Sequence, residues 1–290
     1  IERLRDAGGE AIEVLPVNPL RALFVRFDLR DHRKIAVIDR RIAYTGSMNI
    51  ADPRFFKQDA GVGEWVDAMV RIEGPAAWVL EAVSLTVTSL QTGNRFAPPP
   101  PPILEPAGTS HVQIFPSGPQ ASTLPIDALL LAAIYAARRE IALTTPYFVP
   151  GEALLTALRT AALRGVQVVL IVPEKIDSRL VRYASEAYNE DLLEVGVTIL
   201  RFRDGLLHTK SVVVDEEFTV FGTVNLDLRS FELNFELSLI AFDHEFSSAT
   251  RALQHAYEAR SSALRLDEWR ARPRSRRLLE NAVQMMSPLL

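Results

Sequence analysis

The sequence predicts an α/β fold, and three observations lead to that prediction. Short apolar segments alternate with helical segments along most of the chain after residue 110. A motif that begins at His32 recurs at His208. Five consecutive prolines at 98–102 interrupt the chain between the two copies. We therefore expect two related α/β units joined by a linker.

Composition narrows the class of protein. Of the 290 residues, 48% are hydrophobic, which is enough for a sizeable core and excludes wholesale disorder. The net charge of −4 argues against a partner, such as nucleic acid, that is held by a broad basic surface. The absence of cysteine excludes disulfides, thiolate catalysis and zinc–thiolate sites. No apolar run is long enough to span a membrane, and no signal-peptide pattern is present.

Before the prolines, the expected elements are short. A helix at 1–7 ends at Gly8 and Gly9, because glycine readily adopts the left-handed conformation found at helix C-termini. A second helix is predicted at 75–90 from its apolar spacing. Strands are expected at 11–14, 34–38, 42–45 and 65–72.

The stretch 94–110 is rich in proline, glycine and polar residues and lacks apolar periodicity. Proline fixes the backbone in an extended form, so this stretch predicts a stiff linker. The first domain is then expected at 1–93 and the second at 111–290.

After the linker, strands and helices alternate. The apolar run at 166–172 is typical of a strand buried on both faces. Gly165 and Gly196 each follow a helical pattern and are expected to end it. The other predicted strands are 111–115, 140–148, 197–202 and 211–215, and the predicted helices are 125–139, 152–164 and 178–194.

The repeat carries the chemistry. HRKIAVIDRRIAYTGSMNI and HTKSVVVDEEFTVFGTVNL align without a gap, and both read HxKxxxxD followed by GxxN. The chain has only four lysines and five histidines, so two aligned copies are not a chance event. The matched pairs are His32 with His208, Lys34 with Lys210, Asp39 with Asp215, Gly46 with Gly222, Ser47 with Thr223 and Asn49 with Asn225.

The spacing within each copy suits a phosphate. In HxK the imidazole and the ammonium are two residues apart, so on a strand they share one face. The glycine lets backbone approach a ligand closely, while the asparagine and hydroxyl groups supply neutral donors. A single HxK is usually a polar strand edge, but its duplication favours two half-sites around one phosphodiester.

A metal site is the competing interpretation. Each copy offers one histidine and an aspartate seven residues later, whereas a structural or catalytic metal needs three or four ligands. The paired lysines would also repel a cation. We therefore expect neither a metal nor another cofactor.

The duplicated motifs resemble the phospholipase D superfamily. Flanking segments such as WVDAMVRIEGPA, TPYFVPGEALL, NFELSL and the terminal MSPLL are similar to bacterial cardiolipin synthases, and the resemblance covers essentially the whole chain. It implies two phospholipase D-like α/β/α sandwich domains with a shared, pseudo-twofold active site. The first half has eight residues before Gly9. In the second half, about 85 residues lie between the linker and the matching Gly196. We therefore expect an incomplete first domain and a fragment that is poorly soluble or less active.

The resemblance also implies a reaction without metal. One motif histidine attacks the phosphodiester of phosphatidylglycerol and forms a phosphohistidine. The other protonates the departing glycerol and then deprotonates the incoming hydroxyl of a second phosphatidylglycerol. By analogy, His32 is assigned as the nucleophile and His208 as the acid/base.

The remaining site residues are expected to support these histidines. Glu236 is expected to hold the far nitrogen of His208, and Asp67 that of His32. Asp39 and Asp215 belong to the catalytic motif, although their place on the far side of the strands favours an orienting role. The groups expected to stabilise the phosphoryl oxygens are Lys34, Lys210, Asn49 and Asn225, with Ser47 and Thr223 as further support.

The expected partners are phosphatidylglycerol and the lipid surface of a bacterial cell membrane, with any transmembrane anchor before residue 1. Tyr147 and Phe148 follow a strand end and could line a substrate path or pack in the core. A phospholipase D that uses water or another alcohol shares the same motifs. A nuclease or other phosphodiesterase is disfavoured by the net charge, and a non-catalytic adaptor by the two intact motifs.

Overall fold

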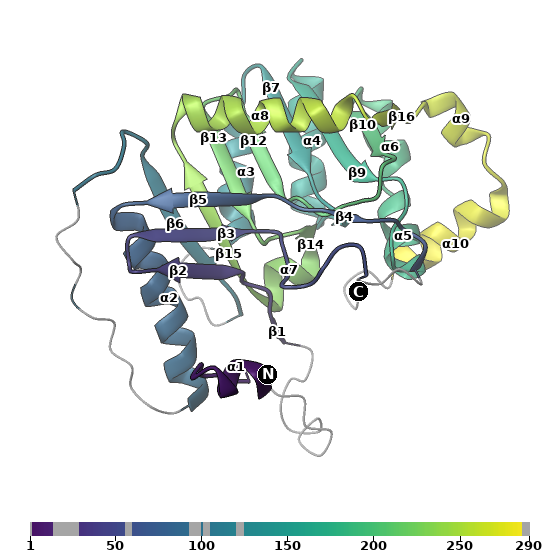
Figure 1. Cartoon of the computed structure of the whole chain (residues 1–290). Coiled ribbons are helices and arrows are strands. Elements are labelled where there is room, and N and C mark those ends of the chain that lie inside the picture. The colour runs from purple at the N-terminus through teal and green to yellow at the C-terminus, as the bar shows by residue number, and fades with distance from the viewer. Residues whose placement is uncertain are drawn as a thin grey trace.

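The computed structural model describes residues 2–13, 29–55, 60–92, 100, 105–119 and 125–285. It shows a large mixed sheet with helices on both faces, beside a smaller antiparallel sheet from the first half of the chain (Figure 1). The predicted α/β fold class is confirmed.

The large sheet contains nine strands within the described part of the chain. Its parallel strands carry runs of apolar and β-branched residues that are buried on both faces, as the sequence predicted for 166–172. In spatial order the strands are β1 (Arg30–Asp31), β15 (Asn234–Ala241), β13 (Phe218–Gly222), β12 (Ser211–Val214), β7 (Glu140–Thr144), β9 (Gln167–Pro173), β10 (Thr198–Phe202) and β16 (Ser261–Ala263), and β6 (Val112–Ser117) also pairs with β15.

Helices cover both faces of this sheet. α3 (Ile126–Ala136) and α4 (Glu152–Leu163) pack on one face, with Leu158 in the main apolar core. α8 (His244–Glu258) crosses the other face, where Tyr257 packs against residues of β9 and β10 (Figure 1). The site described below therefore rests on a sheet that is held from both sides.

One predicted strand is divided in the structure. The expected strand at 140–148 becomes β7 and a short β8 (Phe148–Val149) that pairs with β14 (Leu226–Asp227). Pro146 lies between them and has no N–H to donate to a ladder, so the chain leaves the sheet there.

One predicted helix is also divided. The expected helix at 178–194 becomes α5 (Arg179–Glu186) and α6 (Asn189–Glu194). Between them, Tyr188 is buried and its ring packs edge-on against Phe148, with ring centroids 6.4 Å apart. Packing of this aromatic pair, which apolar periodicity does not reveal, accompanies the break.

The first half contributes a three-stranded antiparallel sheet of β2 (Ile35–Ile38), β3 (Ile42–Gly46) and β5 (Met69–Glu73). α2 (Pro75–Thr92) follows, and its Leu80 shares an apolar cluster with β15 of the large sheet. The predicted strand at 65–72 is divided into β4 (Trp65–Val66) and β5. Among the described residues, β2 pairs on one side only, whereas its counterpart β12 pairs with both β13 and β7.

The remaining elements lie towards the chain ends. The expected helix at 1–7 is confirmed as α1 (Glu2–Asp6), but 11–13 form no strand and residue 14 lies outside the described residues. Most of the stretch 94–110 also lies outside them, so the domain division remains a proposal.

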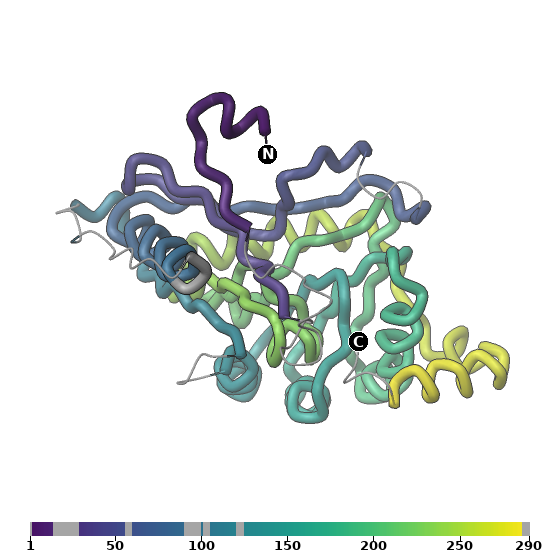
Figure 2. The backbone as a smooth tube through the Cα atoms, turned by 90° about the horizontal axis from the view of Figure 1, so that it is seen from below, coloured from purple at the N-terminus to yellow at the C-terminus, as the bar shows by residue number. Residues whose placement is uncertain are grey.

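Four helices of the structure were not predicted from the sequence. They are α7 (Leu228–Glu232), α8, α9 (Leu266–Arg270) and α10 (Arg274–Gln284), and α9 and α10 project beyond the large sheet in Figure 2.

The two motif aspartates occupy turns. Asp39 and Arg40 have φ values of 51° and 59°, and Asp215 and Glu216 have 54° and 55°. Such left-handed pairs suit a tight hairpin turn, and aspartate tolerates this conformation better than most residues. Both turns lie at the ends of β2 and β12 that are remote from the motif histidines. This placement favours the orienting role for both aspartates, and a catalytic role for them stays a prediction.

Asp215 has a structural task. Its carboxylate accepts backbone N–H groups of Arg138, Arg139 and Glu140 at 2.8–2.9 Å, which fixes the entry into β7. These bonds also keep the pKa of Asp215 below its usual value, although partial burial opposes them. Asp39 is exposed on the other hairpin.

We expect Asp215→Asn to lower the free energy of unfolding by about 1–3 kcal/mol, because an amide cannot accept all three bonds. Urea denaturation measures this change. The matched variant Asp39→Asn should be nearly neutral, because asparagine also tolerates the turn conformation. A loss of activity in Asp215→Asn without any loss of stability would restore the catalytic interpretation.

Candidate active site

Each motif histidine follows a short strand that pairs with the other half of the molecule. β1 runs parallel to the start of β15, and β11 (Leu206–Leu207) runs parallel to β4. The backbone N–H of His32 donates to the carbonyl oxygen of Phe235 at 2.9 Å, and that of His208 donates to the carbonyl oxygen of Val66 at 2.8 Å. Both histidines are therefore aligned by backbone hydrogen bonds with strands of the opposite half.

The pairing of histidines with carboxylates is the reverse of the expected one. His32 Nδ1 lies 3.1 Å from Glu236 Oε1, and His208 Nδ1 lies 2.7 Å from Asp67 Oδ1. The predicted pairs, Glu236 with His208 and Asp67 with His32, were wrong. The reason is the parallel pairing of β1 with β15 and of β11 with β4, which carries each carboxylate to the histidine of the other half.

The hydroxyl groups of the repeat hold these carboxylates. Ser47 Oγ donates to Asp67 Oδ1 at 2.6 Å, and Thr223 Oγ1 donates to Glu236 Oε2. Both hydroxyl groups are buried, and Glu236 is fully buried with them. They orient the carboxylates instead of serving as direct donors to a phosphate, a finer role than the sequence indicated.

The two motif glycines allow close contact between strands. A Cβ at Gly46 would lie 2.4 Å from the carbonyl oxygen of Ala68, and one at Gly222 would lie 2.2 Å from that of Leu237. Backbone atoms cannot move away cheaply, so both positions require glycine. The close approach expected at a ligand is thus an approach to the strand segment that carries the carboxylate.

The two motif lysines make equivalent contacts. Lys34 Nζ donates to the carbonyl oxygen of His32 at 2.7 Å, and Lys210 Nζ donates to that of His208 at 2.6 Å. Burial lowers the pKa of Lys210 to about 7, and the nearby charge of Lys34 adds to this shift. Burial also lowers the pKa of Lys34, although Glu236 and Asp67 oppose it. The mutual influence shows that the two half-sites lie in one electrostatic environment.

His208 is neutral at physiological pH. Burial, and then the charge of Lys210, lower its pKa to about 4, although the bond to Asp67 opposes both. Burial raises the pKa of Asp67, but the hydrogen bond and charge of His208 outweigh it and leave the pKa lowered. Nδ1–H of His208 then donates to Asp67, which leaves Nε2 with its lone pair. The ring of Trp65 packs against this imidazole, with centroids 4.5 Å apart.

Asn234 was missed by the sequence analysis. Its Nδ2 lies 3.1 Å from His32 Nδ1 and 3.3 Å from Glu236 Oε1, and it donates to the carboxylate when His32 Nδ1 carries a proton. The signal was the NxE spacing on a strand, which puts both side chains on one face. The equivalent position two residues before Asp67 is Trp65, which packs on the other histidine.

A cavity of about 250 Å³ opens beside His32. Asn225 and Tyr147 line it, and the Tyr147 hydroxyl donates to Asp177 at 2.7 Å. Phe148 is buried and does not line this cavity. Of the two aromatic residues, Tyr147 is therefore the one that can line a substrate path there. Asn49 is half-buried and does not line it.

Within the described residues, no group of three or more histidine, cysteine, aspartate or glutamate side chains could hold a metal ion. The convergent groups are two imidazoles, two carboxylates and two lysines. Such a set can bind a phosphate through its cations and can move protons through its imidazoles.

We expect Asp67→Asn to lower the pKa of His208 further, because the substitution removes the carboxylate that favours the charged imidazole. Glu236→Gln should instead shift the imidazole resonances of His32 and leave those of His208 nearly unchanged. Histidine NMR titrations of both variants measure this. The reverse result, with His208 responding to Glu236→Gln, would contradict the exchanged pairing.

The sequence of this chain is similar to those of known proteins. A family model described as "Cardiolipin synthase, PLD-like domain" matches residues 130–256. Cardiolipin synthase A of Pectobacterium carotovorum subsp. carotovorum (strain PC1) is 50% identical over 293 residues, covering 100% of this chain. That of Proteus mirabilis (strain HI4320) is 49% identical over 99% of the chain. The chain spans 60% of the length of both relatives.

A solved structure gives the same fold. Phosphatidylserine synthase of Haemophilus influenzae Rd KW20 superposes with a TM-score of 0.65 at 13% identity, covering 90% of this chain and 71% of that one. At this identity the likeness concerns the fold alone. Residues 130–256 are thus similar to a phospholipase D-like domain of cardiolipin synthases, and nearly the whole chain is similar to relatives named cardiolipin synthase A.

Proposed function

We propose that this protein is a cardiolipin synthase that transfers a phosphatidyl group between two phosphatidylglycerol molecules. The observation that carries the proposal is the pair of imidazoles, each held by a carboxylate of the opposite half and each with a lysine two residues later. The names of the relatives, cardiolipin synthase A, favour this substrate class.

The first step forms one bond and breaks one. The lone pair of one imidazole Nε2 attacks the phosphorus of phosphatidylglycerol, and the bond from phosphorus to the glycerol oxygen breaks. The second imidazole donates a proton to that oxygen, and glycerol leaves. The products of this step are free glycerol and a phosphatidyl group on the attacking histidine.

The second step reverses the proton transfer. The imidazole that lost its proton takes one from the hydroxyl of a second phosphatidylglycerol, whose oxygen attacks phosphorus as the phosphohistidine bond breaks. By analogy we assign His32 as the nucleophile and His208 as the acid/base. A bound phosphodiester anion favours the cationic forms of His208 and Lys210, so substrate supplies the charge that raises their pKa values.

The lysines carry the phosphoryl charge. A phosphodiester bound between the half-sites brings an anion to two ammonium groups that otherwise repel each other, that of buried Lys210 and that of half-buried Lys34. Asn225 lines the cavity beside His32 and can add a neutral donor there.

We also propose a membrane lipid surface in a bacterial cell as the place of action, because the substrate lipid resides there. No helix of the described residues combines the length and apolar character needed to cross a bilayer.

We expect His32→Ala and His208→Ala each to lower turnover of phosphatidylglycerol by about a thousandfold or more, because each removes a group that forms or breaks a bond. Incubation with phosphatidylglycerol vesicles and separation of the lipids measures this. Asp39→Asn is the matched control and should keep its activity, since Asp39 lies on an exposed turn.

The products decide between related functions. Cardiolipin with glycerol supports the synthase, whereas phosphatidic acid alone would show hydrolysis by a phospholipase D. Substantial turnover in either histidine variant would contradict a site shared by both halves. No turnover in the unchanged full-length protein would favour the non-catalytic adaptor.

Activity should also depend on the charge of Lys210. Because its pKa is lowered to about 7, this lysine is cationic below that pH and neutral above it in the free protein. We expect kcat/KM to fall as pH rises through about 7, and kcat to fall only at higher pH, where bound substrate has raised the pKa.

Profiles of rate against pH measure both limbs. Lys210→Arg is the informative variant, since a guanidinium keeps its charge over this range and should flatten the alkaline limb of kcat/KM in the activity that remains. A kcat/KM that still rises above about pH 8 would contradict a catalytic charge on Lys210.

A further inference from the structure

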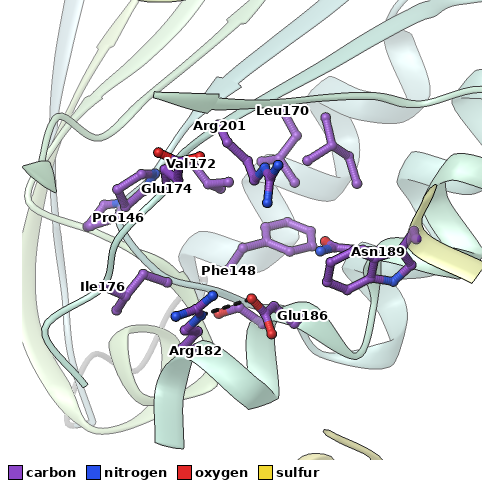
Figure 3. A pocket seen from close by; sticks show the side chains of 14 residues that line it. Pro146, Phe148, Leu170, Val172, Glu174, Ile176, Arg182, Glu186, Asn189 and Arg201 are labelled. Atoms are coloured by element: carbon purple, nitrogen blue, oxygen red, sulfur yellow. Dashed lines mark hydrogen bonds and ion pairs between the residues drawn. The ribbon is translucent and has the colours of Figure 1, made fainter. Parts of the chain in front are cut away.

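A second cavity lies beyond the wall of the candidate active site. Its volume is about 40 Å³, and it sits at the carboxyl ends of β9 and β10, under α5, α6 and α9. Two-residue alternation places Val172 and Arg201, which are neighbours in the parallel register, on the face of the sheet that forms its floor. Figure 3 shows Arg201 over the ring of Phe148, with Asn189 beside it.

Three hydrogen-bond donors of this cavity have no acceptor among the described residues. They are Nε of Arg201, Oγ of Ser185 and Nε1 of Trp269, and each of these atoms is buried. They come from β10, α5 and α9, so residues of three separate elements that carry such donors line one cavity. Trp269 is 6% exposed, and its indole N–H can only donate. Buried donors without acceptors are costly, so such a convergence points to an absent acceptor.

Among the charged side chains that line the cavity, Glu186 is held in ion pairs, whereas Arg201 has no ion-pair partner within the described residues. Arg182 pairs with Glu186 at 3.0 Å, drawn as a dashed line in Figure 3, and Arg276 pairs with the same carboxylate at 2.7 Å. Glu174 lies beside Pro146 and Val172 at the edge of the view, and it is the acidic group that a bound anion would have to tolerate.

The size of the cavity limits the ligand. At about 10–15 Å³ for each water-sized group, the space holds roughly three such groups. This suits the oxygens of one phosphate or carboxylate group, but neither a sugar nor an acyl chain. A guanidinium with two further N–H and O–H donors is also the set that proteins use to bind oxyanions.

We infer that this cavity binds a small oxyanion, of the phosphate class, through Arg201, Trp269 and Ser185. The site goes beyond the proposed function, since none of these three residues belongs to the histidine, lysine and carboxylate set. It is also linked to that set by a common wall. Along β8 and its approach, Pro146 and Phe148 face the oxyanion cavity, whereas Tyr147 and Val149 face the cavity beside His32.

The experiment uses the indole N–H of Trp269 as its reporter. The chain has three tryptophans, so a ¹⁵N-labelled sample gives three indole signals, and Trp269→Phe identifies the relevant one. We expect inorganic phosphate to shift this signal in a saturable way, whereas sodium chloride at equal ionic strength leaves it unchanged. No saturable shift, or the same shift with chloride, would overturn the inference.

Variants separate this cavity from the active site. Arg201→Gln should weaken phosphate binding at least about tenfold, and the smaller change Ser185→Ala should weaken it about threefold or more, because each removes a donor to an anion. Glu174→Gln should strengthen binding, because it removes the carboxylate at the edge of the cavity. Lys210→Met, which disables phosphate binding between the histidines, should leave the Trp269 titration unchanged. If Lys210→Met abolishes it, the shift comes from the active site and the inference fails.

Comparing the binding of a phospholipid with that of inorganic phosphate identifies the source of the oxyanion. A short-chain phosphatidic acid, used below its micelle concentration, offers the same phosphate group as a lipid headgroup. Tighter binding than inorganic phosphate indicates a lipid headgroup as the ligand, and equal or weaker binding indicates free phosphate. Failure of the lipid turnover assay would not affect this titration, so the inference and the proposed function can fail separately.

Discussion

The exchange of hydrogen bonds between the two halves is the constraint on which the candidate active site depends. β1 and β11 each run beside a strand of the opposite half, and the ladder continues into His32 and His208. Because backbone ladders fix register, each imidazole arrives opposite a carboxylate that its own half does not supply. Neither half therefore contains a complete pair of histidine and carboxylate, and the chemistry exists only when the halves are packed together.

Burial then sets the charges of this site. The low pKa of His208, about 4, and that of Lys210, about 7, have the same first cause, the removal of charged groups from water. Two lysines that repel each other inside the protein are costly until an anion enters between them. Under the proposed function, the phosphodiester of the substrate offsets this cost. The closed contacts of Ser47 and Thr223 to the carboxylates hold the acceptors of the imidazoles in place.

The short segment around β8 connects two cavities of different character. The turn at Pro146 allows alternate side chains to face opposite sides, so Tyr147 reaches the cavity beside His32 while Phe148 packs towards the cavity of Arg201. The aromatic contact between Phe148 and Tyr188 in the core holds this segment in place. A ligand on either side therefore meets a wall whose position is set by packing.

The sequence by itself determined which residues make up the core of the candidate site and most of the elements that present them. The aligned motifs identified both histidines and both lysines, and apolar runs with closing glycines located β9, β10 and α4. Such features are local, because periodicity and chain direction act over a few residues. The tertiary structure alone decided that Glu236 serves His32 and Asp67 serves His208, and it revealed Asn234 as their neighbour. These histidine and carboxylate partners are separated by more than a hundred residues, so they are chosen by strand pairing, which linear spacing does not encode.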